Sequence, residues 1–303
     1  MKWNLKILGS SSALPADNRM LSAQLLTTSS HHFLFDCGEG TQFQLRRFKA
    51  PINKIDSIFL THLHGDHIFG IFGLLSTYSL YRRQKPLTIY AHPGFARVVK
   101  SVLRAASVRT EFRIKFVNLN CDGKRLIFED DELEVYSIPL EHSVPVCGFF
   151  VKEKVLLRNV RKDFAREHYI PFYWFDKIKK GEDFVDEDGT VYPNEEITLP
   201  EKEAKKFAYF TDTFYVPGIG KEIENVDVLY HEATFGLEHF DDAVSKLHST
   251  SRQAAMAARE ANAKRLLIGH FSTRYTDVKF LEEEAKKVFK NTTAVNDGME
   301  IDF

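Results

Sequence analysis

The stretch SIFLTHLHGDHIFG, residues 57–70, joins a short apolar run to a dense group of ligating side chains. The run Ile58–Leu60 predicts a buried strand. Four ligating residues follow it within six positions: His62, His64, Asp66 and His67. Gly65 lets the loop bend, so that the last two side chains can face a second cation beside the first. Because four such ligands cannot all serve one zinc ion that must also hold a water molecule, the spacing indicates a two-metal site.

The alternative interpretation of this stretch is a polar loop whose histidines only satisfy backbone groups. Three histidines and one aspartate directly after a buried strand have no evident packing purpose, so we favour metal ligation. The string H-x-H-x-D-H resembles the signature of the metallo-β-lactamase superfamily. That resemblance implies further ligands at the ends of later strands.

Three later apolar runs do end at a candidate ligand. SIPL leads to His142, FAYF leads to Asp212, and LLIG leads to His270. Loops at one end of a sheet converge, so distant residues can assemble a site there. A single strand-end histidine is more often structural, but three matching ends in the order that the superfamily requires favour ligands.

We therefore expect two metal ions that share the carboxylate of Asp212. The first is assigned to His62, His64, His142 and Asp212. The second is assigned to Asp66, His67, Asp212 and His270. Zinc suits imidazole and carboxylate ligands, and manganese or iron is the alternative. Two dications lower the pKa of a water between them, and Asp66 can orient or deprotonate that water, so the expected reaction class is hydrolysis.

The composition describes an ordinary globular chain of 303 residues with a formal net charge of −1. There is no global basic field, so any nucleic acid must meet a local patch. Cys37, Cys121 and Cys147 are scattered without metal-like spacing, and we expect reduced thiols in a cytosolic protein. We find no signal peptide and no membrane-spanning run, so we expect a soluble, cytoplasmic protein that does not enter a membrane.

The order of predicted elements indicates sheets between helices. Residues 3–8, 21–27 and 32–36 read as strands of a meander. Thr41 is expected to cap a helix that runs through Phe48, and a second helix is expected from about Ile68 to Tyr81. Later strands alternate with helices, including one capped near residues 249–251. We therefore expect an α/β (α+β) fold with helices outside the sheets.

Several segments together resemble the ribonuclease Z family, the tRNA 3′-processing endoribonucleases (the short form, tRNase Z). They are FDCGEGTQFQLRRF (35–48), LTHLHGDH (60–67), FTDT (210–213), HEATF (231–235) and HST (248–250). The resemblance covers nearly the whole chain. It implies one metallo-β-lactamase αββα sandwich over residues 1–303 with an inserted flexible arm, two zinc ions per subunit and a homodimer. The implied reaction removes the 3′ trailer from precursor tRNA and leaves a 3′-hydroxyl on the tRNA.

The same resemblance implies an acid for the leaving 3′ oxygen. His248 would donate the proton, and Glu232 would orient and charge its imidazole. The alternative for His248 is a helix-start residue without a catalytic task. For His231 we favour a structural role, because a strand-end histidine often satisfies backbone groups. Asp36, Glu39 and Gln42 are expected to support the site or form the turn.

Residues 152–195 break the strand–helix pattern and are expected to form an arm that projects from the core. Residues 152–180 hold nine basic and four acidic residues, whereas residues 181–203 hold nine carboxylates and one lysine. The basic half suits phosphate contacts, and a solvated charged face is the alternative. The candidate substrate contacts are Arg19, Lys152, Lys154, Arg158, Arg161 and Lys162. The aromatics of residues 172–175 could stack on exposed bases or pack as a small core.

The loop after the first strand matches the family pattern Pro-x-Lys-x-Arg-Asn only in part. Pro15 and Arg19 match, whereas Asp17 and Met20 replace the lysine and the asparagine. Two other functions are weighed against tRNA processing. One is a phosphodiesterase of the same fold that acts on small or cyclic nucleotides, which would need no basic arm. The other is an RNA-binding module without catalysis, which the complete ligand set argues against.

Overall fold

The computed structural model describes residues 2–16, 18–154, 158–199 and 203–303. The chain divides into two compact units. The first consists of Met1–Glu129, Glu134–Lys152 and Lys205–Phe303, and the second of Asp130–Leu133 and Glu153–Ala204. Asp17 lies outside the described residues, so its departure from the family pattern receives no structural account. Among the described residues, no helix has both the length and the apolar character that a membrane crossing needs.

The first unit contains two seven-stranded sheets. The first sheet has the order β16 (Glu300–Asp302), β1 (Asn4–Gly9), β2 (Ala23–Thr27), β3 (His32–Phe35), β4 (Ser57–Phe59), β5 (Leu87–Ala91), β6 (Ile114–Asn118). The second has the order β15 (Thr292–Ala294), β14 (Arg265–Gly269), β13 (Val228–Glu232), β12 (Lys206–Phe210), β9 (Cys147–Glu153), β8 (Leu133–Pro139), β7 (Arg125–Glu129). The strands β3 to β6 are parallel, and so are β12 to β15, so within each of these sets the carboxyl ends share one edge.

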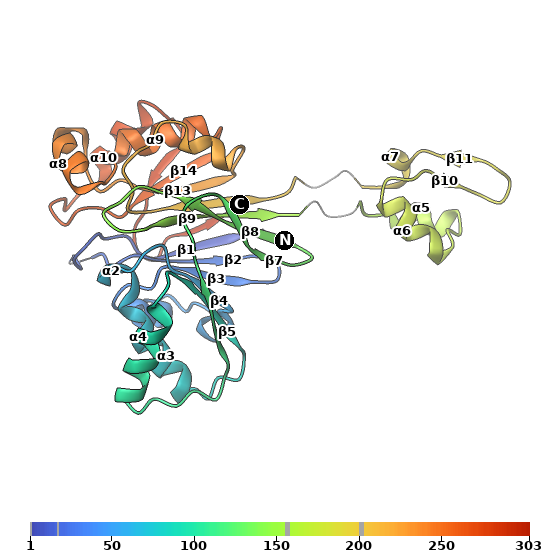
Figure 1. The fold of residues 1–303 in the computed structure, drawn as a ribbon. Coiled ribbons are helices and arrows are strands. Elements are labelled where there is room, and N and C mark those ends of the chain that lie inside the picture. Colours follow the sequence, from blue (N-terminus) through green and yellow to red (C-terminus); the bar gives the residue numbers. More distant parts are fainter. Residues whose placement is uncertain (1, 17, 155–157, 200–202) are drawn as a thin grey trace. The chain divides into compact units, whose positions relative to one another are not determined.

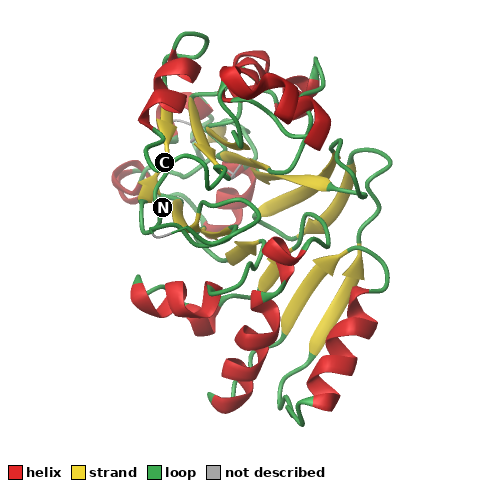
Figure 2. Ribbon diagram, turned by 90° about the vertical axis from the view of Figure 1, so that its left-hand side faces the viewer, coloured by secondary structure: helices red, strands yellow, loops and turns green. Residues whose placement is uncertain are grey.

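Helices cover the outer faces of both sheets (Figures 1 and 2). The first sheet carries α1 (Thr41–Arg47), α2 (Gly65–Ile68), α3 (Gly70–Leu80) and α4 (Phe95–Ala105). The second carries α8 (Phe240–Lys246), α9 (Ser251–Glu260) and α10 (Lys279–Lys286). Short 3-10 helices lie at Ile52–Lys54, Ile219–Ile223 and Leu237–His239. The predicted αββα sandwich is therefore confirmed.

Aromatic side chains fill the space between the two sheets. Phe35 of β3 and Phe59 of β4 stack at a ring-centroid distance of 5.4 Å. From the second sheet, Phe149 lies 5.4 Å from Phe59, and Tyr209 lies 5.4 Å from Phe35. Such rings bury large apolar areas and interlock in preferred geometries. The sheets are thereby held in a fixed relation, which fixes the loops at their edges.

The second unit is small but has its own hydrophobic cluster. Its elements are α5 (Lys162–Glu167), a 3-10 helix (Phe172–Trp174), α6 (Phe175–Lys179), β10 (Phe184–Val185), β11 (Val191–Tyr192) and α7 (Asn194–Ile197). Ile178 and Ile197 are fully buried in the cluster. The aromatic run divides, because Trp174 packs against the cluster while Phe172 and Tyr173 are 92% and 69% exposed. Packing in a small core therefore holds for Trp174, whereas stacking on bases stays a prediction for the exposed Phe172 and Tyr173.

Two expectations about the helices are wrong in detail. Thr41 is the first residue of α1 and not its cap, because Gly40 takes that position with φ of 84°. The Thr41 hydroxyl instead donates to the Gly38 carbonyl at 2.6 Å. The helix expected from about Ile68 to Tyr81 is α3, which runs from Gly70 to Leu80, and the short helix α2 precedes it and ends at Ile68. The helix expected to be capped near residues 249–251 is α9. Its cap is Thr250, which forms a capping box with Gln253.

The expectation of three reduced cysteines is also wrong. Cys121 and Cys147 form a disulfide, whereas Cys37 is a buried free thiol. The two bonded cysteines are 26 positions apart in sequence, Cys121 in the loop after β6 of the first sheet and Cys147 at the start of β9 in the second. Spacing along the chain cannot reveal such a pair, because only the packing of the sheets brings the two residues together.

Candidate metal centre

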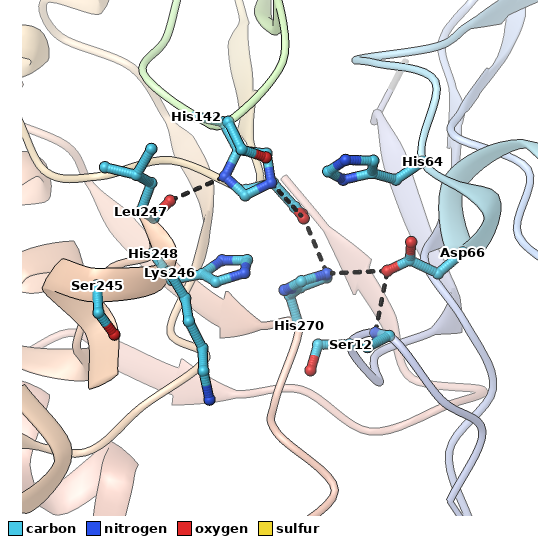
Figure 3. Close-up of a pocket in the computed structure, with 12 residues that line it drawn as sticks. Ser12, His64, Asp66, His142, Ser245, Lys246, Leu247, His248 and His270 are labelled. Atoms are coloured by element: carbon cyan, nitrogen blue, oxygen red, sulfur yellow. Dashed lines mark hydrogen bonds and ion pairs between the residues drawn. The ribbon is translucent and has the colours of Figure 1, made fainter.

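The candidate ligands lie in loops beyond the carboxyl ends of strands. His62 follows β4, Asp212 follows β12, and His270 follows β14. His142 follows β8, and α2 presents Asp66 and His67. These loops surround a cavity of about 390 Å³. Figure 3 shows the side chains of this cavity, with His64, His142 and Asp66 around it.

The first group of ligating atoms gathers around one carboxylate oxygen. Nε2 of His62 lies 3.0 Å from Nδ1 of His64 and 3.7 Å from Oδ2 of Asp212. Nε2 of His142 lies 3.8 Å from the same oxygen. The four ligand atoms are all within 4.8 Å of one another. The structure thus brings together every residue that was assigned to the first metal.

The second group gathers around the other oxygen of the same carboxylate. Oδ1 of Asp212 lies 3.0 Å from Nε2 of His270 and 3.1 Å from Nε2 of His67. Oδ2 of Asp66 lies 3.4 Å from Nε2 of His67 and accepts from the backbone N–H of Ala13 at 3.0 Å. Asp212 therefore faces both groups, one oxygen to each, as a carboxylate shared by two cations would.

Hydrogen bonds on the far sides of the rings determine which nitrogens face the cavity. Nδ1 of His67 donates to Oδ2 of Asp36 at 2.8 Å, and Nδ1 of His142 donates to the Leu247 carbonyl at 3.0 Å. Nδ1 of His270 lies 2.9 Å from the Thr234 hydroxyl, whose own proton goes to Glu232. Because each Nδ1 is engaged on the far side of its ring, each Nε2 faces the cavity and is the nitrogen that could bind a metal.

This arrangement fits a divalent metal. Within the described residues, Nε2 of His67 and Nε2 of His270 are buried atoms that make no hydrogen bond. Both face Oδ1 of Asp212, so a positive charge, either a proton or a metal cation, must lie between each nitrogen and the carboxylate. Imidazole and carboxylate donors in two groups of four suit zinc. The pairing of orphaned nitrogens with a shared carboxylate is what we expect of ligands to a metal pair.

Asp36 joins the metal loop to both sheets. It is fully buried with φ of 54° and accepts from the Thr61 N–H at 2.9 Å and from the Tyr209 hydroxyl at 3.0 Å. Since it also accepts from His67, one carboxylate orients a ligand and fixes the loop before His62. Asp36 therefore has the supporting place expected of it.

The carboxylates make the cavity attractive for positive charge. Burial alone would raise the pKa of Asp212, but His270, His67 and His62 hold that pKa well below its usual value. Burial would lower the pKa of His67, but Asp212 and Asp36 outweigh it and raise the pKa well above normal. A group of acids that pulls protons onto a buried histidine pulls a metal cation by the same attraction.

His248 lies in the wall of the cavity and is paired with Glu232 behind it. Nδ1 of His248 donates to Oε1 of Glu232 at 2.8 Å. Glu232 is fully buried and also accepts from the N–H groups of Thr213 at 2.9 Å and Thr234 at 3.0 Å. Burial acts to lower the pKa of His248, but Glu232 outweighs it and raises that pKa to about 9. His248 is therefore an imidazolium at neutral pH, with a proton available to a leaving group.

Sequence reasoning missed Thr234, which supports the site from behind, and Lys246, which lines the cavity. Thr234 connects the two chemical groups, because its hydroxyl donates to Glu232 at 2.6 Å and lies 2.9 Å from Nδ1 of His270. Lys246 lines the same cavity as His248 and is the cation nearest to it in sequence (Figure 3). In the sequence, Thr234 could have been noticed as the threonine of the HEATF motif, and Lys246 as the lysine two positions before His248.

The candidate substrate contacts prove to be of different kinds. Arg19 is buried and donates to the Tyr275 carbonyl, and burial lowers its pKa. In the second unit, Arg158 donates to Asn194 at 3.0 Å and Arg161 pairs with Asp163 at 2.9 Å. Lys162 is exposed. Arg158 and Arg161 thus serve contacts inside their own unit, which composition alone could not reveal.

Lys152 and Lys154 lie at the end of β9 and just after it. The ammonium of Lys152 lies 3.5 Å from a carboxylate oxygen of Glu134, and the backbone N–H of Lys154 donates to the Glu132 carbonyl at 2.7 Å. Both residues are half-buried. These places next to acidic residues neither require nor exclude a phosphate contact.

The other residues singled out in the sequence lie near the cavity or on its supports. Nδ1 of His231 donates to the Glu232 carbonyl at 2.7 Å, which agrees with the structural role favoured for it. Gln42 accepts from the Thr77 hydroxyl at 3.0 Å and so joins α1 to α3. Glu39 is exposed on the turn before α1.

Two bacterial proteins named Ribonuclease Z match nearly the whole chain. The protein of Phocaeicola vulgatus is 37% identical over 300 residues, which covers 99% of this chain and 97% of its own. The protein of Porphyromonas gingivalis is 39% identical over 300 residues and covers 99% of both chains. The matched span therefore covers 99% of the chain in each case, from the first strand to the last.

Two solved structures share the fold of this chain, and one family model matches its first half. Human tRNase Z, short form, has a TM-score of 0.72 and 27% identity, with 98% of both chains covered. The metallo-beta-lactamase fold protein YhfI from Bacillus subtilis has a TM-score of 0.70 at 19% identity, which supports the fold alone. A family model described as "Anti-Pycsar protein Apyc1" matches residues 3–159. That match ends before Asp212, Glu232, His248 and His270.

Proposed function

The chain belongs to the ribonuclease Z family, and we propose that it cuts precursor tRNA with a pair of zinc ions bound by seven side chains. As a member of this family it is a tRNA 3′-processing endoribonuclease, a phosphodiester hydrolase. The activity predicted from the sequence is thereby confirmed, and hydrolysis of small or cyclic nucleotides is not favoured. The identity of the metal, the number of metal ions per chain, the roles of the residues and the oligomeric state are proposed.

The observation that carries the proposal is the convergence of a ligand set and an acid in one cavity. Asp212 presents one oxygen to each ligand group, and His248 lies in the wall beside them. The first zinc ion would be held by His62, His64, His142 and Asp212. The second would be held by Asp66, His67, Asp212 and His270. When bound, such a pair lowers the pKa of water and polarises a phosphoryl oxygen, and manganese could supply the same chemistry.

Asp66 is the proposed base. It lies at the second ligand group, and the Ala13 N–H at 3.0 Å fixes its Oδ2. The neighbouring His270 and His67 outweigh the effect of burial and hold the pKa of Asp66 below its usual value. An ionised carboxylate in this place accepts a hydrogen bond from the attacking water and orients it toward the phosphorus.

His248 is the proposed acid. Cleavage that leaves a 3′-hydroxyl on the tRNA expels the 3′ oxygen, a poor leaving group that needs a proton. Nδ1 of His248 is occupied by Glu232, so Nε2 carries the proton that is given away. Glu232 keeps the imidazole charged before the transfer and fixes the plane of its ring. This is the division of roles that the sequence resemblance implies.

The second unit is the proposed arm for the body of the tRNA. Lys162 is exposed there, and so are Phe172 and Tyr173. Lysine side chains neutralise phosphates without reading sequence, and exposed aromatic rings stack on bases. We further propose that Arg19 helps to position the acceptor end and that the enzyme is a homodimer, in which the arm of one subunit would serve the cavity of the other.

The test is the cleavage of a precursor tRNA that carries a 3′ trailer. The purified chain is expected to cut once, on the 3′ side of the acceptor stem, and to leave a 3′-hydroxyl that a ligase can join. A chelator should abolish the cut, and added zinc should restore it. Cleavage at many positions, or cleavage that persists after complete metal removal, would contradict the proposal.

A further inference from the structure

The Cys121–Cys147 disulfide joins the two sheets of the first unit. Cys121 lies in the loop after β6, the edge strand of the first sheet. Cys147 is the first residue of β9 in the second sheet. Within each sheet the strands are held by ladders of hydrogen bonds, whereas the two sheets are held together by packed side chains and a few separate hydrogen bonds, such as the one from the Tyr209 hydroxyl to Asp36. A covalent bond at this place therefore controls how firmly the edge of one sheet is held against the other.

The same residues contact the backbone of the metal loop. The Cys147 N–H donates to the Thr61 carbonyl at 3.0 Å. Nε2 of His92 donates to that carbonyl at 3.1 Å and lies 3.5 Å from Sγ of Cys121. Thr61 directly precedes the ligand His62. Cys147 therefore contacts the peptide before this ligand directly, and Cys121 contacts it through His92.

Thr61 also carries the connection to the second ligand group. Its N–H donates to Asp36 at 2.9 Å, and Asp36 accepts from Nδ1 of the ligand His67 at 2.8 Å. A shift of Thr61 would therefore move His62 directly and His67 through Asp36. Contacts that orient metal ligands affect metal affinity by roughly 10- to 100-fold.

We propose that Cys121 and Cys147 form a reversible thiol–disulfide site that controls how firmly the enzyme retains its metal. This inference rests on the proposed function, because precursor tRNA is made in compartments where thiols are kept reduced. A disulfide that forms in such a compartment is transient and responds to oxidants. The oxidised chain holds Thr61 in place and retains metal, and the reduced chain releases metal faster.

The exchange needs only small thiols and disulfides. Cys147 is fully buried and Cys121 is half-buried, so a small thiolate attacks Sγ of Cys121 and Cys147 leaves as a thiolate. A second small thiolate attacks the resulting mixed disulfide and frees Cys121. The sum is two protein thiols and one small disulfide, with two electrons passed to the protein and two protons taken up at the sulfurs. Oxidation by a small disulfide such as glutathione disulfide runs the same steps in reverse.

The test compares the zinc-loaded full chain after equilibration in glutathione buffers of different redox poise. Alkylation and mass spectrometry give the fraction of Cys121–Cys147 disulfide, and a chelating dye gives the rate of zinc release. Zinc release is expected to become roughly tenfold faster as the disulfide is reduced, the lower end of the effect of ligand-orienting contacts. The rate of tRNA cleavage at limiting zinc should fall over the same range of redox poise.

The matched control is the double variant Cys121→Ser and Cys147→Ser. It should release zinc as the reduced wild type does, and glutathione should not change its rate. Redox dependence that persists in this variant would point to Cys37 or to metal binding by glutathione and would overturn the proposal. So would reduction that lowers only the melting temperature, or a reduced chain that takes up an extra zinc ion at His92 and the two thiols. Disulfide content and zinc release are measured without tRNA. A failure of the redox proposal can therefore be told apart from a failure of the chain to cleave precursor tRNA.

Discussion

His248 in the wall of the metal cavity forms an ion pair with the buried Glu232 behind it, with Nδ1 and Oε1 2.8 Å apart. Glu232 is fully buried, so removal of the positive partner would leave a carboxylate without its counter-charge. The pair thus keeps His248 charged, which connects the hydrogen bond to the pH dependence of the reaction.

The cleavage rate is expected to fall at high pH. The pKa of His248 is raised to about 9, so the acid is present at neutral pH and is lost as the pH rises through that value. Glu232→Gln removes the charge that raises this pKa, so the alkaline fall should move toward neutral pH. A pH profile of kcat/KM for both proteins measures the shift, and an unchanged profile would remove Glu232 from this role.

His248→Ala is expected to slow tRNA cleavage by roughly 10²- to 10⁴-fold, the range for a lost general acid. The loss should be small for bis(4-nitrophenyl) phosphate, since nitrophenolate leaves without a proton. The ratio of the two rate losses is the measurement. Equal losses on both substrates would show that His248 does not protonate the leaving oxygen.

Asp66→Asn should reduce cleavage by roughly 10²- to 10⁴-fold, because the amide cannot take a proton from water. The matched control is Asp56→Asn, which removes a carboxylate that accepts from the backbone N–H of His32 at 3.0 Å, away from the cavity. Single-turnover rates at saturating zinc separate this effect from weaker metal binding. Near wild-type cleavage by the Asp66 variant would end its proposed role as the base.

Asp36→Asn is expected to weaken metal binding by roughly 10- to 100-fold, because the amide no longer orients His67 as the carboxylate does. Competition with a chelating dye measures the affinity, and excess zinc should restore much of the cleavage. Glu39→Gln is the matched control, since Glu39 is exposed three positions further along the same turn. An Asp36 variant with unchanged zinc affinity would contradict the account of this network.

Removal of the second unit should separate tRNA recognition from chemistry. Lys152 of β9 and Lys206 of β12 are paired residues of neighbouring antiparallel strands, so a short glycine-containing turn can replace residues 154–204. Cleavage of precursor tRNA is expected to fall by roughly 10²-fold or more with the lost phosphate contacts. Hydrolysis of bis(4-nitrophenyl) phosphate should remain. Parallel loss on both substrates would show that the unit does not serve as a tRNA arm.

The sequence was most informative where chemistry and strand patterns coincide. Apolar runs that end at His62, His142, Asp212 and His270 allowed the site to be placed at strand ends, and the structure gathers these residues there. Regular strands have predictable ends, and ligand types are few. The strand–helix alternation predicted helices outside the sheets, and the family resemblance implied the αββα sandwich.

Other features depend on packing that no local pattern records. Thr234 could not be placed between Glu232 and His270, because the link depends on the register of β13 and β14. The Cys121–Cys147 bond depends on how two sheets meet. The charges of Arg158 and Arg161 are visible in a sequence, whereas their partners Asn194 and Asp163 inside the second unit are known only from the structure.

Zinc titration of the metal-free chain, with bound metal and precursor-tRNA cleavage measured on the same samples, tests the central claim most directly. The account predicts that cleavage at a single site rises to its maximum at two zinc ions per chain. It also predicts that His142→Ala or His270→Ala lowers the bound metal by about one ion, each residue serving one ligand group. Full cleavage with one zinc ion or none would contradict the account.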